Sequence, residues 1–198
     1  GNERFTPEEV MQQAGISYGI SYFTVTDEYL RDHIGQNHYF IYNGMEKRVP
    51  GILNIYITER KERANVYVMG INYLLDEEGM VLRKNTDGLQ EDLPAVTGMQ
   101  TRSVTEGKMI IPGNENQLKS YQAIMTELLA QGYAGEIAEL KVSDPEKLYL
   151  LTRSGYTIEL GDGENLRAKI GTARAVVEKL EAMGYEGGVI DASVPAIA

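Results

Sequence analysis

The chain has 198 residues, of which 42% are hydrophobic and 24% are charged, as in ordinary folded proteins of one large or two small domains. Its formal net charge of −10 argues against a nucleic-acid backbone as the main partner, because phosphate binding needs clustered Lys and Arg, and it gives no polybasic attraction to anionic lipid. The absence of cysteine excludes thiol catalysis, thiolate metal sites and disulfides. No apolar run approaches the ~20 residues that span a bilayer.

The first part of the chain predicts two helices followed by a hairpin. Thr6-Pro7-Glu8-Glu9 has the form of a helix start, with a capping Thr, a Pro at the first helical position and acids at the positive helix end, and Gly15 ends this helix. A second helix covers residues 26–35. Alternating apolar residues then predict strands at 45–49 and 52–59 around a Pro-Gly turn. The turn pair Asn43-Gly44 marks either the start of the first strand or a bulge.

A second pattern of short strands and two long helices starts near residue 64. Its predicted elements are strands at 66–68, 73–75 and 80–82, a helix at 116–131, a three-strand meander over 137–160, a helix at 166–183 and an extended segment at 188–194. The whole pattern predicts an α+β protein of two abutting domains. Residues 1–63 form helices on a short sheet, and residues 64–198 form an antiparallel-sheet β domain with two long helices.

The side chains that could support catalysis or metal binding are few. His33 and His38 are the only histidines, and neither has a second ligand at metal-binding spacing, so surface or helix-end positions explain them. No Gly-x-Ser-x-Gly motif is present. Gly161 to Asn165 resembles a fragment of a calcium loop but lacks the alternating ligands and the distal Glu. A strand-to-helix turn with Glu164 or Asn165 near the cap explains this segment. We predict no catalytic residue, no metal and no cofactor.

Several segments, taken in order, resemble the FtsQ/DivIB family of bacterial cell-division proteins. No single one is specific, but together they cover nearly the whole chain, and the departure at His38-Tyr39, where the family usually has Pro-Tyr, is a tolerated change at a strand start. The segments are GNERFTPEEV at 1–10, ILNIYITER at 52–60, LLDEEGMVL at 74–82, LPAVTG at 93–98, and the closing pairs Leu160-Gly161, Lys169-Ile170 and Ile190-Asp191.

The resemblance implies a domain order, a location and partners. Residues 1–63 would be a POTRA-like domain that lacks part of its first strand, and residues 64–198 the family's β domain. Such proteins are non-enzymatic scaffolds and regulators of septum formation, which bind FtsL and an FtsB/DivIC-type protein. They act on the extracytoplasmic side of the bacterial cell membrane at the division septum. A single membrane helix, upstream of residue 1, would anchor the chain.

The last extended segment is the predicted partner-binding site. It follows a helix, its β-branched residues favour a strand, and the resembled family places its FtsB/DivIC contact near this end. We therefore expect an edge strand that accepts a partner strand by β-augmentation. The alternative is an edge that is simply solvated or blunted by Pro195. The predicted contact residues are Val189, Ile190, Asp191, Ala192, Ser193 and Val194.

Two other functions stay open from the sequence. A POTRA-bearing protein of polypeptide export or assembly would bind unfolded chains through sheet edges, and tandem POTRA repeats would favour it. A cell-wall carbohydrate-binding or hydrolase domain would favour exposed Trp and a carboxylate cleft, and the chain has no Trp. The 29 acidic residues alone do not indicate a glycosidase, because the separation of two carboxylates is the diagnostic feature.

Overall fold

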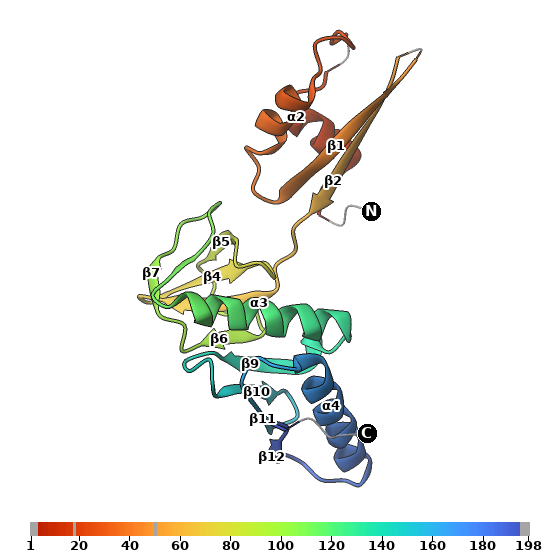
Figure 1. Cartoon of the computed structure of the whole chain (residues 1–198). Helices are drawn as coiled ribbons and strands as arrows, with labels where there is room; N and C mark the ends of the chain where they lie inside the picture. Colours follow the sequence, from red (N-terminus) through yellow and green to blue (C-terminus); the bar gives the residue numbers. More distant parts are fainter. Residues whose placement is uncertain (1–3, 18, 50, 195–198) are drawn as a thin grey trace. The chain divides into compact units, whose positions relative to one another are not determined.

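The computed structural model describes residues 4–17, 19–49 and 51–194, and the chain forms two compact units, Gly1–Lys61 and Glu62–Ala198 (Figure 1). The unit boundary lies two residues before the predicted boundary at 63/64. Both units combine helices with sheet, which confirms the α+β class. In the described part of the chain, no helix has both the length and the hydropathy needed to span a bilayer.

The first unit contains two short helices and a hairpin, as predicted. Thr6 caps the first helix in a complete capping box with Glu9, and the Thr26 side chain caps the second by accepting from the backbone N–H of Tyr29. The strand before the turn begins earlier than predicted. The elements are α1 (Pro7–Gln13), α2 (Asp27–Ile34), β1 (Phe40–Arg48) and β2 (Ile52–Glu59).

The hairpin packs its apolar side against both helices. The register shifts between Tyr42 and Gly44, so the Asn43-Gly44 pair marks a β-bulge, one of the two predicted alternatives. Gly51 provides the positive φ of 87° that the turn requires. The core of this unit consists of the buried residues Ala14, Val25, Leu30, Ile34 and Phe40.

The two outer edges of this hairpin carry no further strand from the described ranges. There, β1 and β2 pair only with each other. The opening strand that the resemblance predicts to be partly missing would precede Gly1-Asn2, so the described residues do not test it. It stays a prediction.

The second unit is one eight-stranded sheet with two long helices and a small two-stranded sheet. The strand order is β12-β11-β10-β9-β6-β3-β4-β5, with β7-β8 as a separate pair. Most predicted strands are present, but β6, β7 and β8 are additional. The elements are β3 (Ala64–Val68), β4 (Ile71–Leu75), β5 (Val81–Asn85), β6 (Ala95–Thr97), β7 (Thr101–Ser103), β8 (Ile111–Pro112), α3 (Glu115–Ala130), η1 (Ala134–Glu136), β9 (Ile137–Lys141), β10 (Leu148–Thr152), β11 (Tyr156–Gly161), α4 (Leu166–Ala182) and β12 (Gly188–Asp191).

The predicted sheet was antiparallel, whereas the observed sheet is mixed. The pairs β3–β6, β6–β9 and β11–β12 are parallel. For β6–β9 and β11–β12, the physical reason is that α3 and α4 each lie in the crossover between the two strands, which returns the chain to the same end of the sheet. β3 and β6 are instead connected through β4, β5 and the segment 86–94. The alternation of strand, long helix and strand is the sequence signal for this arrangement.

One face of the sheet carries both helices (Figure 1). A row of apolar residues in register crosses six strands on this face and packs in the core with α3 and α4: Val66, Val96, Leu140, Leu150, Ile158 and Ile190. Side chains alternate between the two faces of a strand, so the neighbouring row points away from the helices. That row contains Asn65, Ala95, Glu139, Leu151, Thr157 and Val189.

Candidate protein-binding interface

Strand β12 forms one end of the eight-stranded sheet. It pairs in parallel with β11, with Thr157 opposite Val189 and Glu159 opposite Asp191. On its other side it has no strand neighbour among the described residues. The segment therefore lies at a sheet edge, as predicted.

The backbone directions along β12 determine which groups a partner could reach. The N–H of Ala192 donates to the Glu159 carbonyl at 2.9 Å, so it points inward, toward β11. Backbone groups alternate along a strand, so the N–H and C=O groups of Ile190 also face β11. Val189 and Asp191 present their N–H and C=O groups to the outer side. These two residues carry the hydrogen-bonding groups that a partner strand would use.

The side chains of β12 divide between core and solvent. Ile190 packs against the core, and Ala192 is 5% exposed. Val189 is 70% exposed and lies on the helix-free face. An exposed β-branched side chain beside open backbone groups is suited to contact with a partner strand.

The chain leaves the sheet after Ala192 in a short turn. The carboxylate of Asp191 accepts from the Ser193 backbone N–H at 2.9 Å and from the Ser193 hydroxyl at 2.6 Å, and these bonds lower the pKa of Asp191. A Cβ at Gly161 would lie 3.0 Å from the Ser193 Cβ, so the turn sits closely on β11. Ser193 and Val194 therefore lie beyond the strand, and Pro195 lies outside the described residues.

A shallow hollow lies on the helix-free face near this edge. Its volume is about 300 Å³, and it is lined by side chains of β9, β10 and β11, including Glu139, Tyr149 and Thr157. The Lys141 ammonium lies 5.9 Å from the centre of the Tyr149 ring, within cation–π range. Because Thr157 is in register with Val189, the hollow and the exposed edge share one face of the sheet.

The segment that resembles a calcium loop is a strand-to-helix turn, as predicted. Asn165 is the N-cap of α4, in a left-handed conformation without a side-chain cap bond. The Asp162 carboxylate accepts from the Lys169 ammonium at 2.6 Å, and Lys169 also donates to the Asp162 carbonyl at 3.1 Å. Lys169 is only 2% exposed. The first acid of the loop is thus neutralised by a buried lysine.

This pair gives a testable stability prediction. The hydrogen bond from Lys169 lowers the pKa of Asp162, so the carboxylate stabilises the fold above its unfolded pKa of about 4, and this stabilisation is lost as the pH falls through the lower folded value. Asp162→Asn should lower the thermal midpoint at pH 7 by roughly 5 °C, because the buried ammonium loses its counter-charge. Thermal melts below about pH 4 should show a smaller difference between the variant and the parent. Adding Lys169→Met should restore most of the loss, and failure to do so would contradict this role.

The first histidine occupies a structural position. His33 lies in the last turn of α2, where its Nδ1 is 2.7 Å from the Tyr29 carbonyl oxygen and its ring stacks on the Tyr29 ring. The ring of His38 lies beside that of Tyr39, with 5.2 Å between the ring centres. No group of three or more His, Cys, Asp or Glu residues in the described ranges is arranged to hold a metal ion.

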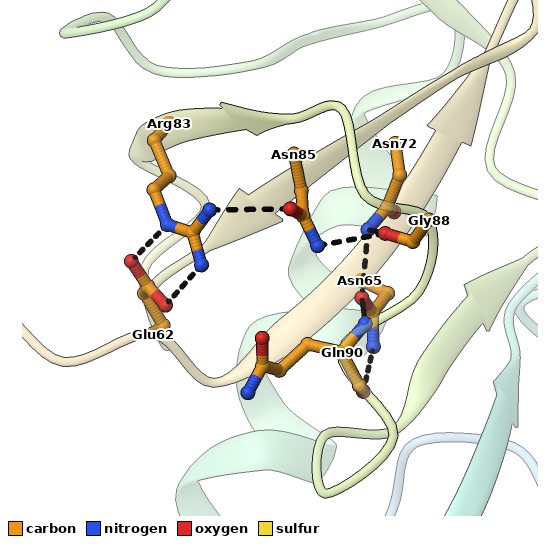
Figure 2. Close-up of polar contacts among 7 residues, drawn as sticks. All are labelled: Glu62, Asn65, Asn72, Arg83, Asn85, Gly88 and Gln90. Carbon is orange, nitrogen blue, oxygen red and sulfur yellow. Dashed lines mark hydrogen bonds and ion pairs between the residues drawn. The ribbon is translucent and has the colours of Figure 1, made fainter.

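A second polar cluster lies on the other half of the sheet, in β3, β4 and β5 (Figure 2). Asn65, Asn72 and Asn85 are 1%, 2% and 6% exposed. The Asn65 amide donates to the carbonyls of Gln90 and Leu93, both at 2.9 Å, and its side-chain oxygen accepts from the Gln90 N–H at 2.8 Å. Through these bonds the Asn65 side chain satisfies backbone groups of the segment 86–93, as a neighbouring strand would do.

The other residues of this cluster hold the same segment 86–93. The Gly88 carbonyl accepts from the amides of Asn72 at 2.9 Å and Asn85 at 2.7 Å (Figure 2). Arg83 links Asn85 to Glu62, donating to them at 3.2 Å and 2.7 Å respectively. These polar groups bind one another and the segment 86–93, so the cluster is structural. Sequence reasoning missed it because three separate Asn residues carry no spacing that identifies them as partners.

Comparison with known families accounts for most of the chain. Residues 66–193 match the family described as "Cell division protein FtsQ/DivIB, C-terminal", and residues 1–60 match "POTRA domain, FtsQ-type". The second match confirms the POTRA-like fold expected for the first unit.

Individual relatives agree with these matches. A "Cell division protein FtsQ" of Myxococcus fulvus is 27% identical over 193 residues, covering 96% of this chain and 66% of the relative. Another from Geotalea daltonii is 26% identical over 163 residues, covering 81% of this chain and 58% of the relative. The chain thus spans less than two thirds of the length of either. The solved extracytoplasmic domain of DivIB from Geobacillus stearothermophilus aligns with a TM-score of 0.40 and 16% identity, covering 63% of this chain and 97% of that domain.

Proposed function

The chain belongs to the FtsQ/DivIB family of cell division proteins, and from this membership we propose that it binds other division proteins without catalysing a reaction. The partners are FtsL and an FtsB/DivIC-type protein. The observation that carries the proposal is the outer edge of β12, which has no strand neighbour among residues 4–17, 19–49 and 51–194 and where Val189 and Asp191 present backbone N–H and C=O groups to the outer side. A partner strand pairing there would satisfy these groups and cover the exposed Val189 side chain.

The proposed location is the extracytoplasmic side of the bacterial cell membrane, at the division septum. Membership of the FtsQ/DivIB family, together with the FtsQ-type POTRA match, supports this placement. A membrane helix upstream of residue 1 would hold both units at the membrane surface. The net charge of −10 is consistent with attachment by such a helix rather than by electrostatic attraction to anionic lipid.

The division role is favoured over polypeptide export. Residues 66–193 match the FtsQ/DivIB C-terminal family, whereas a tandem POTRA protein would repeat the POTRA fold in this region. A carbohydrate-binding or hydrolase role is less favoured, because exposed Trp would be expected at such a site and the chain has no Trp.

Amide hydrogen exchange tests the proposed binding mode. Adding an FtsB/DivIC-type protein from the same organism should slow exchange at Val189 and Asp191 by about tenfold or more, because their N–H groups become hydrogen-bonded to the partner strand. The inward-pointing amides of Ile190 and Ala192 are already bonded to β11 and serve as internal controls. Protection confined to another surface, with Val189 and Asp191 unchanged in a saturated complex, would contradict β-augmentation at β12.

A further inference from the structure

A cavity of about 290 Å³ lies at the end of α3 nearest to α4, on the helix-covered side of the sheet. It is bounded by the turn after α3, the short helix η1, the β10–β11 turn and the second half of α4. It is separate from the β12 edge, whose residues do not line it. The residues relevant to its chemistry are Tyr133, Glu136, Arg174, Glu178 and Glu181.

Tyr133 is the unusual member of this cavity. The residue is 4% exposed, and its buried hydroxyl has no hydrogen-bond partner in the part of the chain that the structure describes. Burial, together with the charges of Glu181 and Glu136, raises the pKa of Tyr133 to about 12, so the hydroxyl keeps its proton at neutral pH. A buried hydroxyl without a partner is unfavourable, and in native proteins such a group calls for an explanation.

The cavity lining carries more acidic than basic side chains. Arg174 is the one basic residue in the described lining, and its groups are already used: it donates to Glu178 at 2.7 Å and to the Gln131 carbonyl at 2.8 Å, and its guanidinium lies 5.4 Å from the centre of the Tyr133 ring. Glu136 and Glu181 lie at the exposed rim and have no ion-pair partner within residues 4–17, 19–49 and 51–194. The carboxylates of Glu136 and Glu181 are therefore available to pair with the positive charge of a ligand.

We propose that this cavity binds an organic cation, a guanidinium or primary ammonium group, between the carboxylates of Glu136 and Glu181 and above the Tyr133 hydroxyl. The carboxylates would accept charge-assisted hydrogen bonds from the cation, and the tyrosine oxygen would accept a further N–H. The carboxylates in the described part of the chain are not grouped closely enough to hold a metal ion, so a larger cation with several donors suits the site. The group could belong to a free small molecule or to a Lys or Arg side chain of a protein, because both present the same chemistry.

Binding can be measured by NMR titration of residues 1–198 with four compounds: L-argininamide, putrescine, the capped peptide acetyl-Gly-Arg-Gly-amide, and its neutral analogue acetyl-Gly-citrulline-Gly-amide. The three cations should shift the resonances of Tyr133 and Glu181, and the citrulline peptide should bind at least tenfold more weakly than the arginine peptide. Stronger binding of the peptide than of the free cations would identify a protein side chain as the source. Stronger binding of the free cations would identify a small molecule.

Variants separate a binding role from a structural one. Glu136→Gln and Glu181→Gln should each weaken L-argininamide binding at least tenfold, whereas Glu146→Gln, an exposed glutamate outside the cavity, should leave it unchanged. Tyr133→Phe should keep or raise the thermal midpoint of the free protein, because an unpaired buried hydroxyl is removed, and should lose the midpoint increase that L-argininamide gives the parent. The proposal is overturned if the citrulline peptide binds as well as the arginine peptide, or if all variants respond to L-argininamide like the parent.

Discussion

Replacing Asn65 by Leu should lower the free energy of unfolding of the second unit by about 3 kcal/mol or more. The change removes the side chain that bonds to the backbone of Gln90 and Leu93 and to the Asn72 amide (Figure 2). Buried groups left without partners cost about 1–3 kcal/mol each, and not all of them can find water on the face of β3 that this segment covers. Urea unfolding of the parent and the variant measures the difference.

The matched control is Asn116→Leu. Asn116 is exposed in the first turn of α3, and its side chain holds no buried segment, so a change within about 0.5 kcal/mol is expected. Equal stabilities of the Asn65 and Asn116 variants would show that the segment 86–93 is held by other contacts. A selective rise in the exchange of the Gln90 amide in Asn65→Leu would assign the loss to the release of this segment.

Placing Pro at Val189 or Asp191 should reduce affinity for an FtsB/DivIC-type partner by at least about tenfold, because each change removes an outward N–H and adds a ring at the pairing edge. Ala192 and Ser193 are less suitable positions for this test. The Ala192 N–H bonds to Glu159 within the sheet, and the Ser193 N–H bonds to Asp191. Binding measured by calorimetry, with thermal melts as a check on folding, gives the comparison.

Val189→Thr is the matched control for the proline variants. It keeps the backbone N–H and the β-branched shape, so affinity should change only a few-fold if backbone hydrogen bonds dominate recognition. A folded Val189→Pro chain that binds as tightly as the parent would place the partner elsewhere. A large loss in Val189→Thr would instead indicate that the side chain carries the contact.

Local signals predicted most elements of this fold. Thr6 and Thr26 cap the two helices where their sequences indicate, and the alternation along 52–59 identifies β2. The strand directions were predicted only in part, since an antiparallel sheet was expected and three of the pairs are parallel. β6 is three residues long, too short for periodicity to identify, yet it joins β3 to β9 in the middle of the sheet.

The candidate interface was predictable only in outline. The order of the elements places residues 188–194 at a sheet edge, but which backbone groups point outward depends on the register with β11, which no local pattern encodes. Burial of Ala192 and the turn from Asp191 to Ser193 likewise depend on contacts with Glu159 and Gly161. The Tyr133 cavity combines three separate stretches of chain, so no sequence pattern groups its residues.

The parallel pairing of β11 with β12 also fixes an order of events during folding. β12 can join the sheet only after α4 has carried the chain back across the sheet, and such non-local closure is slow compared with the formation of neighbouring hairpins. During synthesis, residues 188–191 leave the ribosome after all the other strands of this sheet, and until they dock, β11 is the outermost strand. A partner that pairs with β12 therefore engages only chains in which the last strand is in place. Recognition at this edge would then also select for molecules that have finished folding.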